Sequence, residues 1–546
     1  MEEQGESKER VQRAPFETAL HYAGYGTFQW LLLMSCGAVY AVCALSTTTL
    51  SFVLPAAEQD FKLSSSDKGR LTATPLIGMC VGSYFWGNLA DARGRKKVII
   101  GALLLDALAA FLSSVVQSFP AFLACRFFSG FGIIGATGLI FTYFGDFLSL
   151  RHRDVMLCRL EVFWTLGTIL LPGIAWFIIQ DCRLNLTADD ADFKYTSWRV
   201  FVAACGIPSL LVVLLLTPFP ESPRYLLHAN KTEQALQVLQ RIFVVNTKLS
   251  EKDFPVESMI NADGDEEEVV SADNNGNETK VPMTWNQRWQ AFWERKKMLT
   301  TPPYIGLLVL CCFVDFGLMF SYYTLMMWFP DLFERFSQFS SLYGESVSAG
   351  VCEVSANVSR VWGDMGNLTN LQHMKNETDD ILLIDVQGCH HSLDDSVYTH
   401  TLVVALSCIP TALWVGLTIN VVGKKLMLVM MLISSGLAAL GLNLVRSSLE
   451  NLLLSCVFEA IVSCTEAVLF CVICEIFPTK VAATAMAVTV MCGRIGAIVG
   501  NVVFGALVDQ HCVVPIYMFG TFLITSGLLC IILPKSTRPE RPPAIQ

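Results

Sequence analysis

Charge is scarce in this chain of 546 residues. Asp, Glu, Lys and Arg make up 16% of the sequence, whereas a soluble protein carries about a quarter. Hydrophobic residues make up 53% and are gathered in long blocks. Too few charged side chains remain to cover a large soluble core, so a soluble globular protein is excluded. The long apolar blocks are typical of a protein whose solvent is the lipid bilayer.

Features that would indicate an enzyme or a secreted soluble protein are also missing. Met1–Arg13 is polar and mixed in charge, so we expect no cleavable signal peptide there and expect the first apolar block to stay in the bilayer. Cys471 and Cys474 lack the second pair of Cys or His residues that a zinc site needs. The sequence contains no phosphate loop and no nucleophile–base arrangement. We therefore expect no enzyme activity, no cofactor and no metal, and the net charge of −10, much of it in two acidic loops, gives no sign of a nucleic-acid partner.

Twelve segments are long and apolar enough to cross a membrane, which takes roughly 20 residues of helix. They must be helices, because unpaired backbone amides are too costly in lipid. The expected spans are residues 28–54, 70–90, 97–117, 121–146, 155–179, 199–219, 304–329, 398–420, 425–445, 452–474, 484–508 and 513–534. The order of six spans, a long gap and six more spans predicts an all-α membrane protein built from two six-helix halves.

Basic residues in the short loops predict the orientation, because cytosolic loops are enriched in Lys and Arg. Such residues follow the second, fourth and eighth spans: Arg93, Arg95, Lys96 and Lys97, then Arg151 and Arg153, then Lys424 and Lys425. All three loops fall on one side, which we take as cytosolic together with both termini. The expected parts are a cytosolic tail at 1–27, a six-helix bundle at 28–220, a cytosolic linker with amphipathic helices at 221–303, a second bundle at 304–534 with a lumenal loop at 331–397, and a cytosolic tail at 535–546.

The predicted lumenal side carries glycosylation acceptors and cysteines. The acceptors expected to be modified are Asn185, Asn357, Asn367 and Asn376. Cys352 and Cys389 share the long lumenal loop and are the first candidates for a disulfide, since that compartment is oxidising. Cys182 and Cys512 are also predicted to be lumenal, so the pairing stays open.

One short turn occurs twice, at the same place in each half. Residues 87–96 read GNLADARGRK between the second and third spans, and residues 416–425 read GLTINVVGKK between the eighth and ninth. We expect these turns to act in gating, with the Gly, Asp/Asn, Gly and basic positions repeated: Gly87, Asp91, Gly94 and Arg95, then Gly416, Asn420 and Gly423. Gly87 should let two helices approach closely, Asp91 should cap the next helix, and Arg95 should pair with a carboxylate across the interface between the halves. The alternative is a basic cytosolic anchor.

The repeated turn resembles that of the major facilitator superfamily, and the resemblance covers essentially the whole chain. Arg126-x-x-x-Gly130, residues 220–224 (PESPR) and residues 475–479 (EIFPT) are similar to motifs of its organic-ion and sugar branches. The resemblance implies two pseudo-symmetric six-helix bundles that transport by alternating access, and it adds Arg126 and Glu475 to the gating residues.

Within this superfamily the chain is most similar to the synaptic vesicle glycoprotein 2 family. The similarity lies in residues 26–30 (GTFQW), 197–199 (SWR), Tyr322-Tyr323 with residues 328–331 (WFPD), and a long lumenal loop with three acceptor sites. The chain departs from that family in having a shorter loop without its repeats. Residues 41–46 (AVCALS) stand where the family has an acidic pair in the first span.

Charged side chains within the spans are the candidate substrate site, because such charges usually face the bundle interior. The candidates, with nearby aromatic residues, are Arg159, Glu161, Trp164, Asp315, Tyr322, Tyr323, Glu459, Glu466 and Arg494. We expect Arg159 and Glu466 to oppose each other, as a gate, a substrate clamp or a static ion pair. The excess of acids over bases favours a cation or amine. Asp106, in a span outside the cavity of this fold, is expected to be structural.

The sequence therefore predicts a secondary transporter of a small organic solute, with a proton or ion as a candidate coupling partner. A vesicle membrane is the favoured location by resemblance, and a monomer in the lipid bilayer is the expected state. Two alternatives stay open: a non-transporting vesicle glycoprotein that regulates or sorts other proteins, and a plasma-membrane carrier of organic cations.

Overall fold

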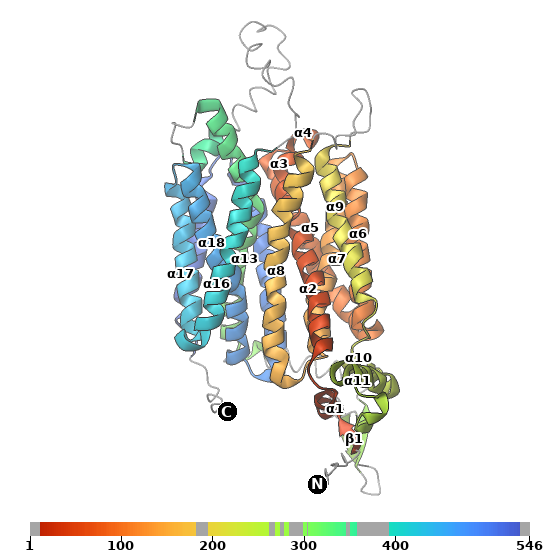
Figure 1. Cartoon of the computed structure of the whole chain (residues 1–546). Helices are drawn as coiled ribbons and strands as arrows, with labels where there is room; N and C mark the ends of the chain where they lie inside the picture. The colour runs from red at the N-terminus through yellow and green to blue at the C-terminus, as the bar shows by residue number, and fades with distance from the viewer. Residues whose placement is uncertain are drawn as a thin grey trace, which may run out of the picture.

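Long helices make up most of the chain in the computed structural model, which describes residues 11–181, 195–260, 268–272, 278–282, 297, 299–302, 304–344, 350–357 and 393–534. The first half consists of α2 (Thr27–Thr48), α3 (Leu50–Ala56), α4 (Glu58–Phe61), α5 (Ser65–Arg93), α6 (Arg95–Val115), α7 (Phe119–Gly145), α8 (Leu150–Ile179) and α9 (Ser197–Leu216). The second half consists of α13 (Tyr304–Tyr343), α16 (Asp395–Val422), α17 (Lys424–Gly441) with η4 (Leu442–Leu444), α18 (Ser448–Ile476), α19 (Thr479–Leu507) and α20 (Val513–Cys530). Figure 1 shows the long helices standing side by side.

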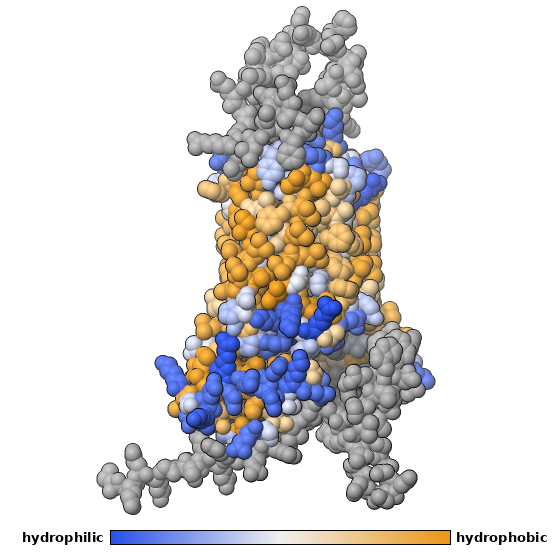
Figure 2. All heavy atoms as spheres, turned by 90° about the vertical axis from the view of Figure 1, so that its right-hand side faces the viewer, coloured by the Kyte–Doolittle hydropathy of each residue, from blue (hydrophilic) through white to orange (hydrophobic). Residues whose placement is uncertain are grey.

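Among the described residues, eleven helices are long and apolar enough to span a membrane. The face in Figure 2 carries a broad apolar band between two polar zones, as expected for a surface in contact with lipid. The helix α5 is longer than α6 and α7 but less apolar, and it completes the first half. The predicted all-α membrane fold is therefore confirmed.

The two halves repeat the same packing. In the first half α2 contacts α7, α8 and α9, α5 contacts α7, and α6 contacts α7 and α9. In the second half α13 contacts α18, α19 and α20, α16 contacts α18, and α17 contacts α18 and α20. The main contacts between the halves are those of α5 with α19 and of α8 with α16. By the packing just described, α5 corresponds to α16 and α8 to α19, so the two contacts are equivalent to each other. A pseudo-two-fold axis therefore relates the halves, as in transporters built from repeats.

Smaller elements lie at the two ends of the bundle (Figure 1). We call the end near α1, α10 and α11 the terminal side, and the end near α3 and α4 the distal side. The smaller elements are β1 (Val11–Pro15), α1 (Phe16–Ala23), α10 (Pro223–His228), α11 (Thr232–Thr247), η2 (Glu251–Asp253), β2 (Val256–Ile260), β3 (Glu268–Ala272) and β4 (Glu278–Pro282). β1 and β2 pair in parallel, with Val11 opposite Val256, and β3 and β4 pair antiparallel. The part of the predicted linker that carries Trp285, Trp289 and Trp293 lies outside the described residues.

Asn246 in α11 ties the linker to the start of the first span. Its Oδ1 accepts from the Phe28 backbone N–H (2.9 Å), and its Nδ2 donates to the Gly24 carbonyl (3.0 Å) and to Gln29 Oε1 (3.0 Å). Because α11 buries its apolar face, including Leu239 and Ile242, the segment is a packed helix rather than a loose connection.

The helix α13 runs past the predicted end of the seventh span. It continues through Pro330 to Tyr343, so the start of the predicted lumenal loop is helical. Leu332, Phe333 and Phe336 are buried on one face of this extension, and that packing outweighs the backbone hydrogen bond lost at the proline.

Asp106 in α6 joins four helices of the first half. Its carboxylate accepts hydrogen bonds from Ser46 Oγ of α2 (3.0 Å), Ser129 Oγ of α7 (2.6 Å) and Ser209 Oγ of α9 (2.8 Å). The expected structural role of Asp106 is thus visible in its contacts, because each hydroxyl satisfies part of a carboxyl group that no water reaches.

Replacing Asp106 with Ala should destabilise the first half. Three serine hydroxyls lose their acceptor, and an unpaired buried polar group costs about 1–3 kcal/mol. We expect a lower midpoint of thermal unfolding for the detergent-solubilised Asp106→Ala protein. Glu233→Ala, at an exposed position of α11, is the control and should leave the midpoint unchanged. Equal midpoints for Asp106→Ala and the wild type would contradict the role of Asp106.

Candidate functional site

A small cavity lies between the two halves. Its volume is about 20 Å³, which is room for roughly one water molecule. It is lined by Leu76 of α5, by Met319 and Tyr323 of α13, by Glu466 of α18, and by Val490, Arg494 and Ala497 of α19. Three of the predicted substrate-site residues therefore meet at one place: Tyr323, Glu466 and Arg494.

Arg494 reaches from the second half to the first. Its Nη1 donates to the Met79 sulfur on α5 at 3.1 Å, although a thioether is a weak acceptor. The charges of Glu466 and Arg494 act on each other. Within the described residues, however, these two make no ion pair within 4.0 Å. A cation and an anion thus share one cavity without binding each other directly.

Glu161 belongs to α8 in the first half and does not line the small cavity. Its Oε2 accepts a hydrogen bond from the Tyr40 hydroxyl (3.1 Å), and the Tyr40 ring lies 5.2 Å from the ring of Trp164. The charge of Glu466 acts on Glu161, so these two carboxyl groups of different halves lie within electrostatic range of each other. The space between the halves therefore has acidic groups on both sides.

Arg159 does not take part in this arrangement. We predicted that it opposes Glu466, but its guanidinium lies over the ring of Trp30 (4.9 Å) and donates to the Met156 sulfur (3.6 Å). Both Arg159 and Trp30 are exposed. The prediction is wrong in this conformation, because similar depth in two helices does not fix the direction of a long side chain, and an exposed arginine finds a better site over an aromatic ring.

Asp315 and Glu459 are deeply buried carboxyl groups of the second half. Asp315 is 0% exposed and Glu459 is 6% exposed. Among the described residues, both carboxylate oxygens of Asp315 and one of Glu459 lack a hydrogen-bond partner. Neither side chain lines the small cavity. Tyr322, the neighbour of Tyr323, is also buried, and the charge of Glu459 acts on it.

The repeated turns form matching ion pairs on the terminal side. Arg95 at the start of α6 pairs with Asp146 at the end of α7, and Lys424 at the start of α17 pairs with Glu475 near the end of α18. Each pair lies within one half. The prediction that Arg95 reaches across the interface is therefore wrong, because the end of the antiparallel neighbour α7 supplies the nearer carboxylate.

The next lysine of each turn anchors the last helix of its half. Lys96 Nζ donates to the carbonyls of Thr217 (2.7 Å) and Phe219 (2.6 Å), just after α9. Lys425 Nζ donates to the carbonyls of Ile531 (2.8 Å) and Leu533, just after α20. A cation at the end of a helix satisfies carbonyls that have no partner within the helix.

The glycines of the two turns have different roles. Gly94 (φ 102°) and Gly423 (φ 89°) adopt backbone conformations that other residues rarely take. A Cβ atom at Gly87 or Gly416 would meet nothing within 4 Å, so the prediction that Gly87 permits a close helix approach is wrong. The cap of α6 also differs from the prediction, which assigned it to Asp91.

The first turn of α6 is capped from the segment after α9. The Lys96 N–H donates to Glu221 Oε1 at 2.8 Å, and the N-cap residue Gly94 offers no side chain. Asp91, the predicted cap, lies exposed near the end of α5. The side chain of Asn420 lies outside the described part of the chain.

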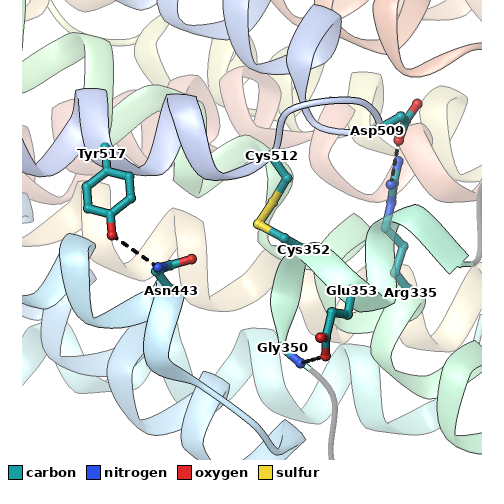
Figure 3. The surroundings of a disulfide bond; sticks show 8 residues. All are labelled: Arg335, Gly350, Cys352, Glu353, Asn443, Asp509, Cys512 and Tyr517. Carbon is teal, nitrogen blue, oxygen red and sulfur yellow. Dashed lines mark hydrogen bonds and ion pairs between the residues drawn. A yellow bond between two sulfur atoms is a disulfide. The ribbon is translucent and has the colours of Figure 1, made fainter.

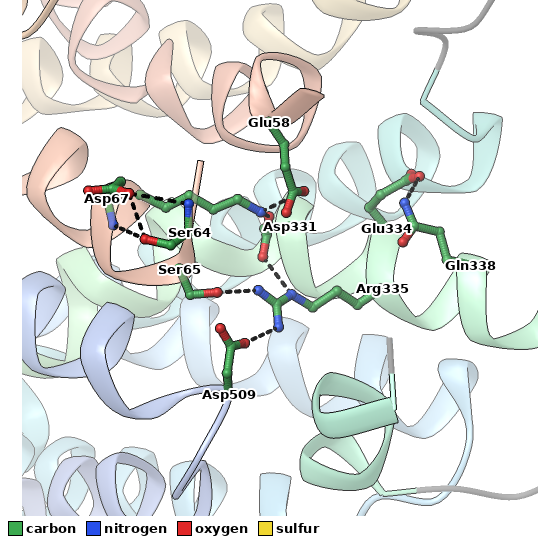
Figure 4. Close-up of polar contacts among 10 residues, drawn as sticks. Glu58, Ser64, Ser65, Asp67, Asp331, Glu334, Arg335, Gln338 and Asp509 are labelled. Atoms are coloured by element: carbon green, nitrogen blue, oxygen red, sulfur yellow. Dashed lines mark hydrogen bonds and ion pairs between the residues drawn. The ribbon is translucent and has the colours of Figure 1, made fainter. Parts of the chain in front are cut away.

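A polar network that we did not predict closes the distal side (Figure 4). Lys68 of α5 is 1% exposed and donates to Asp331 of α13 and to Glu58 of α4 (2.9 Å). Arg335 of α13 donates to Asp331, to Asp509 and to Ser65 Oγ of α5, each at 2.9 Å. Lys68 and Ser65 belong to the first half and Asp331 and Arg335 to the second, so these bonds hold the halves together.

The backbones of the two halves also touch at this network. A Cβ atom at Gly69 of α5 would lie 3.0 Å from the Cα of Gly505 of α19, and a Cβ at Gly505 would lie 2.5 Å from the Ser65 carbonyl oxygen. Only glycine lets α5 and α19 come this close. We call this crossing and the network around Asp331 the distal clamp.

Arg126 is placed inside the first half. Its guanidinium donates to Ser113 Oγ of α6 and lies 5.5 Å from the Phe122 ring. The structure brings it to neither the distal clamp nor the small cavity, because its side chain packs between α7 and α6.

A disulfide on the distal side joins Cys352 to Cys512, 160 residues apart (Figure 3). The first candidate pairing, Cys352 with Cys389, is therefore wrong, because Cys512 in the connection between α19 and α20 lies next to the helical turn at residues 351–357. Cys182 and Cys389 lie outside the described residues, as do the acceptors Asn185, Asn367 and Asn376. Asn357 is half-buried at the end of that helical turn.

Comparisons with known proteins agree with this architecture. Residues 30–358 match the family described as sugar (and other) transporter, and residues 391–546 match the major facilitator superfamily. Synaptic vesicle glycoprotein 2B of Homo sapiens is 28% identical over 593 residues, which cover 95% of this chain and 85% of that protein. Synaptic vesicle glycoprotein 2A of Rattus norvegicus is 34% identical over 343 residues, which cover 60% of this chain and 45% of that protein.

Solved structures share the fold. The inward-open conformation of the xylose transporter XylE from E. coli superposes with a TM-score of 0.62, at 16% identity, over 93% of this chain and 97% of that one. Its partially occluded inward-open conformation gives a TM-score of 0.61.

Asp331→Ala should loosen the distal clamp. It leaves Lys68 and Arg335 buried without their shared carboxylate, and removing one partner of a buried ion pair costs about 3–5 kcal/mol. We expect faster hydrogen–deuterium exchange in the first turns of α5 and in the distal extension of α13. Arg70→Ala is the control, since Arg70 pairs with Asp67 on an exposed surface (3.4 Å). Unchanged exchange in Asp331→Ala would show that the clamp does not hold the halves together.

Non-reducing mass spectrometry should detect a peptide that joins Cys352 to Cys512. Cys512→Ser should abolish this species, whereas Cys389→Ser should leave it in place, because Cys389 is not the partner of Cys352. A cross-linked peptide containing Cys352 and Cys389 in the wild-type protein would contradict the pairing.

Proposed function

The chain belongs to the sugar (and other) transporter family of the major facilitator superfamily, and we propose that it carries a small organic solute across a membrane by alternating access. The pseudo-two-fold relation between the halves supports this proposal, because rocking of one half against the other exposes a central site to each side in turn. The contacts of α5 with α19 and of α8 with α16 form the surface over which the halves would move.

The solute is an organic cation or amine. The charge of Glu466 acts on Glu161 across the two halves, and Arg494 is the base that lines the cavity with Glu466. Arg159, which would have balanced these acids, lies over Trp30 instead. Tyr40 and Tyr323 place aromatic rings beside the carboxyl groups, where a positive charge is attracted to the ring face. The acidic surplus at the interface is the single observation that carries this assignment.

In the present conformation the distal clamp is closed and the cavity beside Glu466 and Arg494 has room for about one water. A solute of several heavy atoms enters only after the halves have moved apart. Entry from the terminal side leaves the clamp intact, and release on the distal side requires the Lys68–Asp331 pair and the Gly69–Gly505 crossing to separate. The clamp is therefore the distal gate of the proposed cycle.

The small cavity is also the observation that favours a second candidate, a non-transporting membrane glycoprotein that regulates or sorts other proteins. The first span supports it as well, because residues 41–46 contain no acidic side chain. Uptake measurements separate the two functions: a protein of the second kind moves no amine, sugar or organic ion.

We assign the protein to a vesicle membrane, with both termini in the cytosol and one chain as the working unit. The names of the vesicle glycoprotein relatives and the basic loops on the terminal side support this assignment. A fluorescent tag on the chain distinguishes a vesicle address from the plasma membrane. Protease accessibility of N- and C-terminal tags tests the orientation.

Proteoliposomes that contain the purified protein should take up radiolabelled tetraethylammonium. Glu466→Gln should reduce the rate by about tenfold or more, because a factor of ten corresponds to only ~1.4 kcal/mol of lost interaction. Glu233→Gln, an exposed residue of α11, is the matched control and should keep the wild-type rate. Xylose is tested in parallel. Uptake of xylose alone would refute the cation assignment, and no flux with either solute would refute transport of both classes.

A further inference from the structure

Asp315 occupies an environment that differs from that of every carboxylate in the distal clamp. Its side chain is 0% exposed, and neither of its oxygens has a hydrogen-bond partner among the described residues. The side chain packs against the backbone of α19. The contact is close: a Cβ atom added at Gly493 would lie 2.3 Å from Asp315 Oδ2. The fit of the carboxyl group against Gly493 leaves no room for a water molecule between them.

Several ionisable groups surround Asp315. Glu466 of α18 and Arg494 of α19 act on it electrostatically. The thiols nearby are Cys311 and Cys312 of α13, Cys492 of α19 and Cys530 of α20, all of which are free. Helices α3 and α16 also pack against α13, the helix that carries Asp315. Helix α3 contains no ionisable residue, and the ionisable residues of α16 lie in its distal half: Asp395, Tyr398, His400 and Cys408.

Arg494 is the cation that acts on Asp315, yet it is not bound to it. Its guanidinium is directed across the interface to the Met79 sulfur of α5 (3.1 Å). A carboxylate is a far stronger acceptor for arginine than a thioether. An ionised Asp315 would therefore compete successfully for Arg494, and the observed contact with Met79 fits a neutral carboxylic acid.

We propose that Asp315 binds the proton that couples to solute movement. The inference rests on the proposed transport function and deepens it by naming the coupling ion and its site. In the present conformation the carboxyl group is neutral, since a buried carboxylate without donors is too costly in this environment. On release the O–H bond breaks, the proton passes to water in the cavity beside Met319, and the carboxylate binds Arg494.

Proton release changes the contact between the halves. When Arg494 turns to Asp315, it leaves Met79, so one link between α19 and α5 is lost. The same two helices cross at Gly69 and Gly505 in the distal clamp. The protonation state of one side chain in the second half thereby alters the interface over which the halves move. Asp315 itself is not a substrate ligand in this scheme, because Met319 and Arg494 line the cavity in front of it.

Two measurements on proteoliposomes test the proposal. The first compares accumulation of radiolabelled tetraethylammonium under a pH gradient with its exchange at equal pH on both sides; xylose replaces it if xylose is the solute moved. Tetraethylammonium has a permanent charge, so a change in pH acts on the protein alone. Asp315→Asn should lose gradient-driven accumulation by about tenfold or more and keep exchange near the wild-type rate. Glu233→Gln should keep both.

The second measurement is infrared difference spectroscopy at neutral pH. The wild-type protein should show the C=O stretching band of a protonated carboxyl group, and this band should be missing in Asp315→Asn. If that variant does not fold, wild-type protein labelled with ¹³C at the aspartate carboxyl groups must show the band with its isotope shift.

Each outcome of these two measurements either supports Asp315 as the proton site or overturns it. A missing band, or accumulation by Asp315→Asn that equals the wild type, overturns the proton site while the transport function stands. A wild-type protein that exchanges neither solute refutes the transport function and the coupling role together. Loss of accumulation with retained exchange, accompanied by the band, establishes Asp315 as the proton site.

Discussion

Asp331 lies where the two halves of the chain meet, and the arrangement around it follows from the cost of leaving a charge unpaired away from water. Its carboxylate binds Lys68 from the first half and Arg335 from the second. Neither cation has solvent to turn to, so both halves are fixed relative to this one group. The glycine crossing beside it then determines how closely α5 and α19 can run, and the positions of the remaining helices follow from the repeated packing within each half.

The centre of the molecule is organised in the opposite way. Around Asp331 every charge has a partner. Glu466 and Arg494, by contrast, line one cavity without a direct bond, and neither oxygen of Asp315 has a partner in the part of the chain that the structure describes. Unsatisfied groups are costly, and they persist where a ligand or an ion completes them for part of a cycle. The protein thus combines a rigid distal side with a central region whose polar groups are ready to change partners. That contrast is what a carrier with a closed distal gate requires.

The sequence predicts the fold well because each span carries its own signal in an apolar stretch of about 20 residues. It misses what depends on distant partners. Lys68 and Asp331 are 263 residues apart, and no local pattern relates them. The sequence predicts the end of the seventh span at Phe329, since the burial of Phe333 and Phe336 that sustains the helix further is a tertiary effect. Depth within a span located Glu466 and Arg159 along their helices but could not give the direction of the Arg159 side chain, which depends on the nearby Trp30 ring.

The bond between Cys352 and Cys512 has a consequence for biosynthesis. Cys512 lies in the connection before the final helix, whereas Cys352 emerges much earlier, in the segment after α13. The thiol of Cys352 must therefore wait, reduced, while the four long helices α16, α17, α18 and α19 are made and inserted. Its oxidation marks the moment at which α19 has reached its full depth in the bilayer. A chain that stalls before that step displays an unpaired thiol on the distal side, which thiol-dependent quality control can recognise.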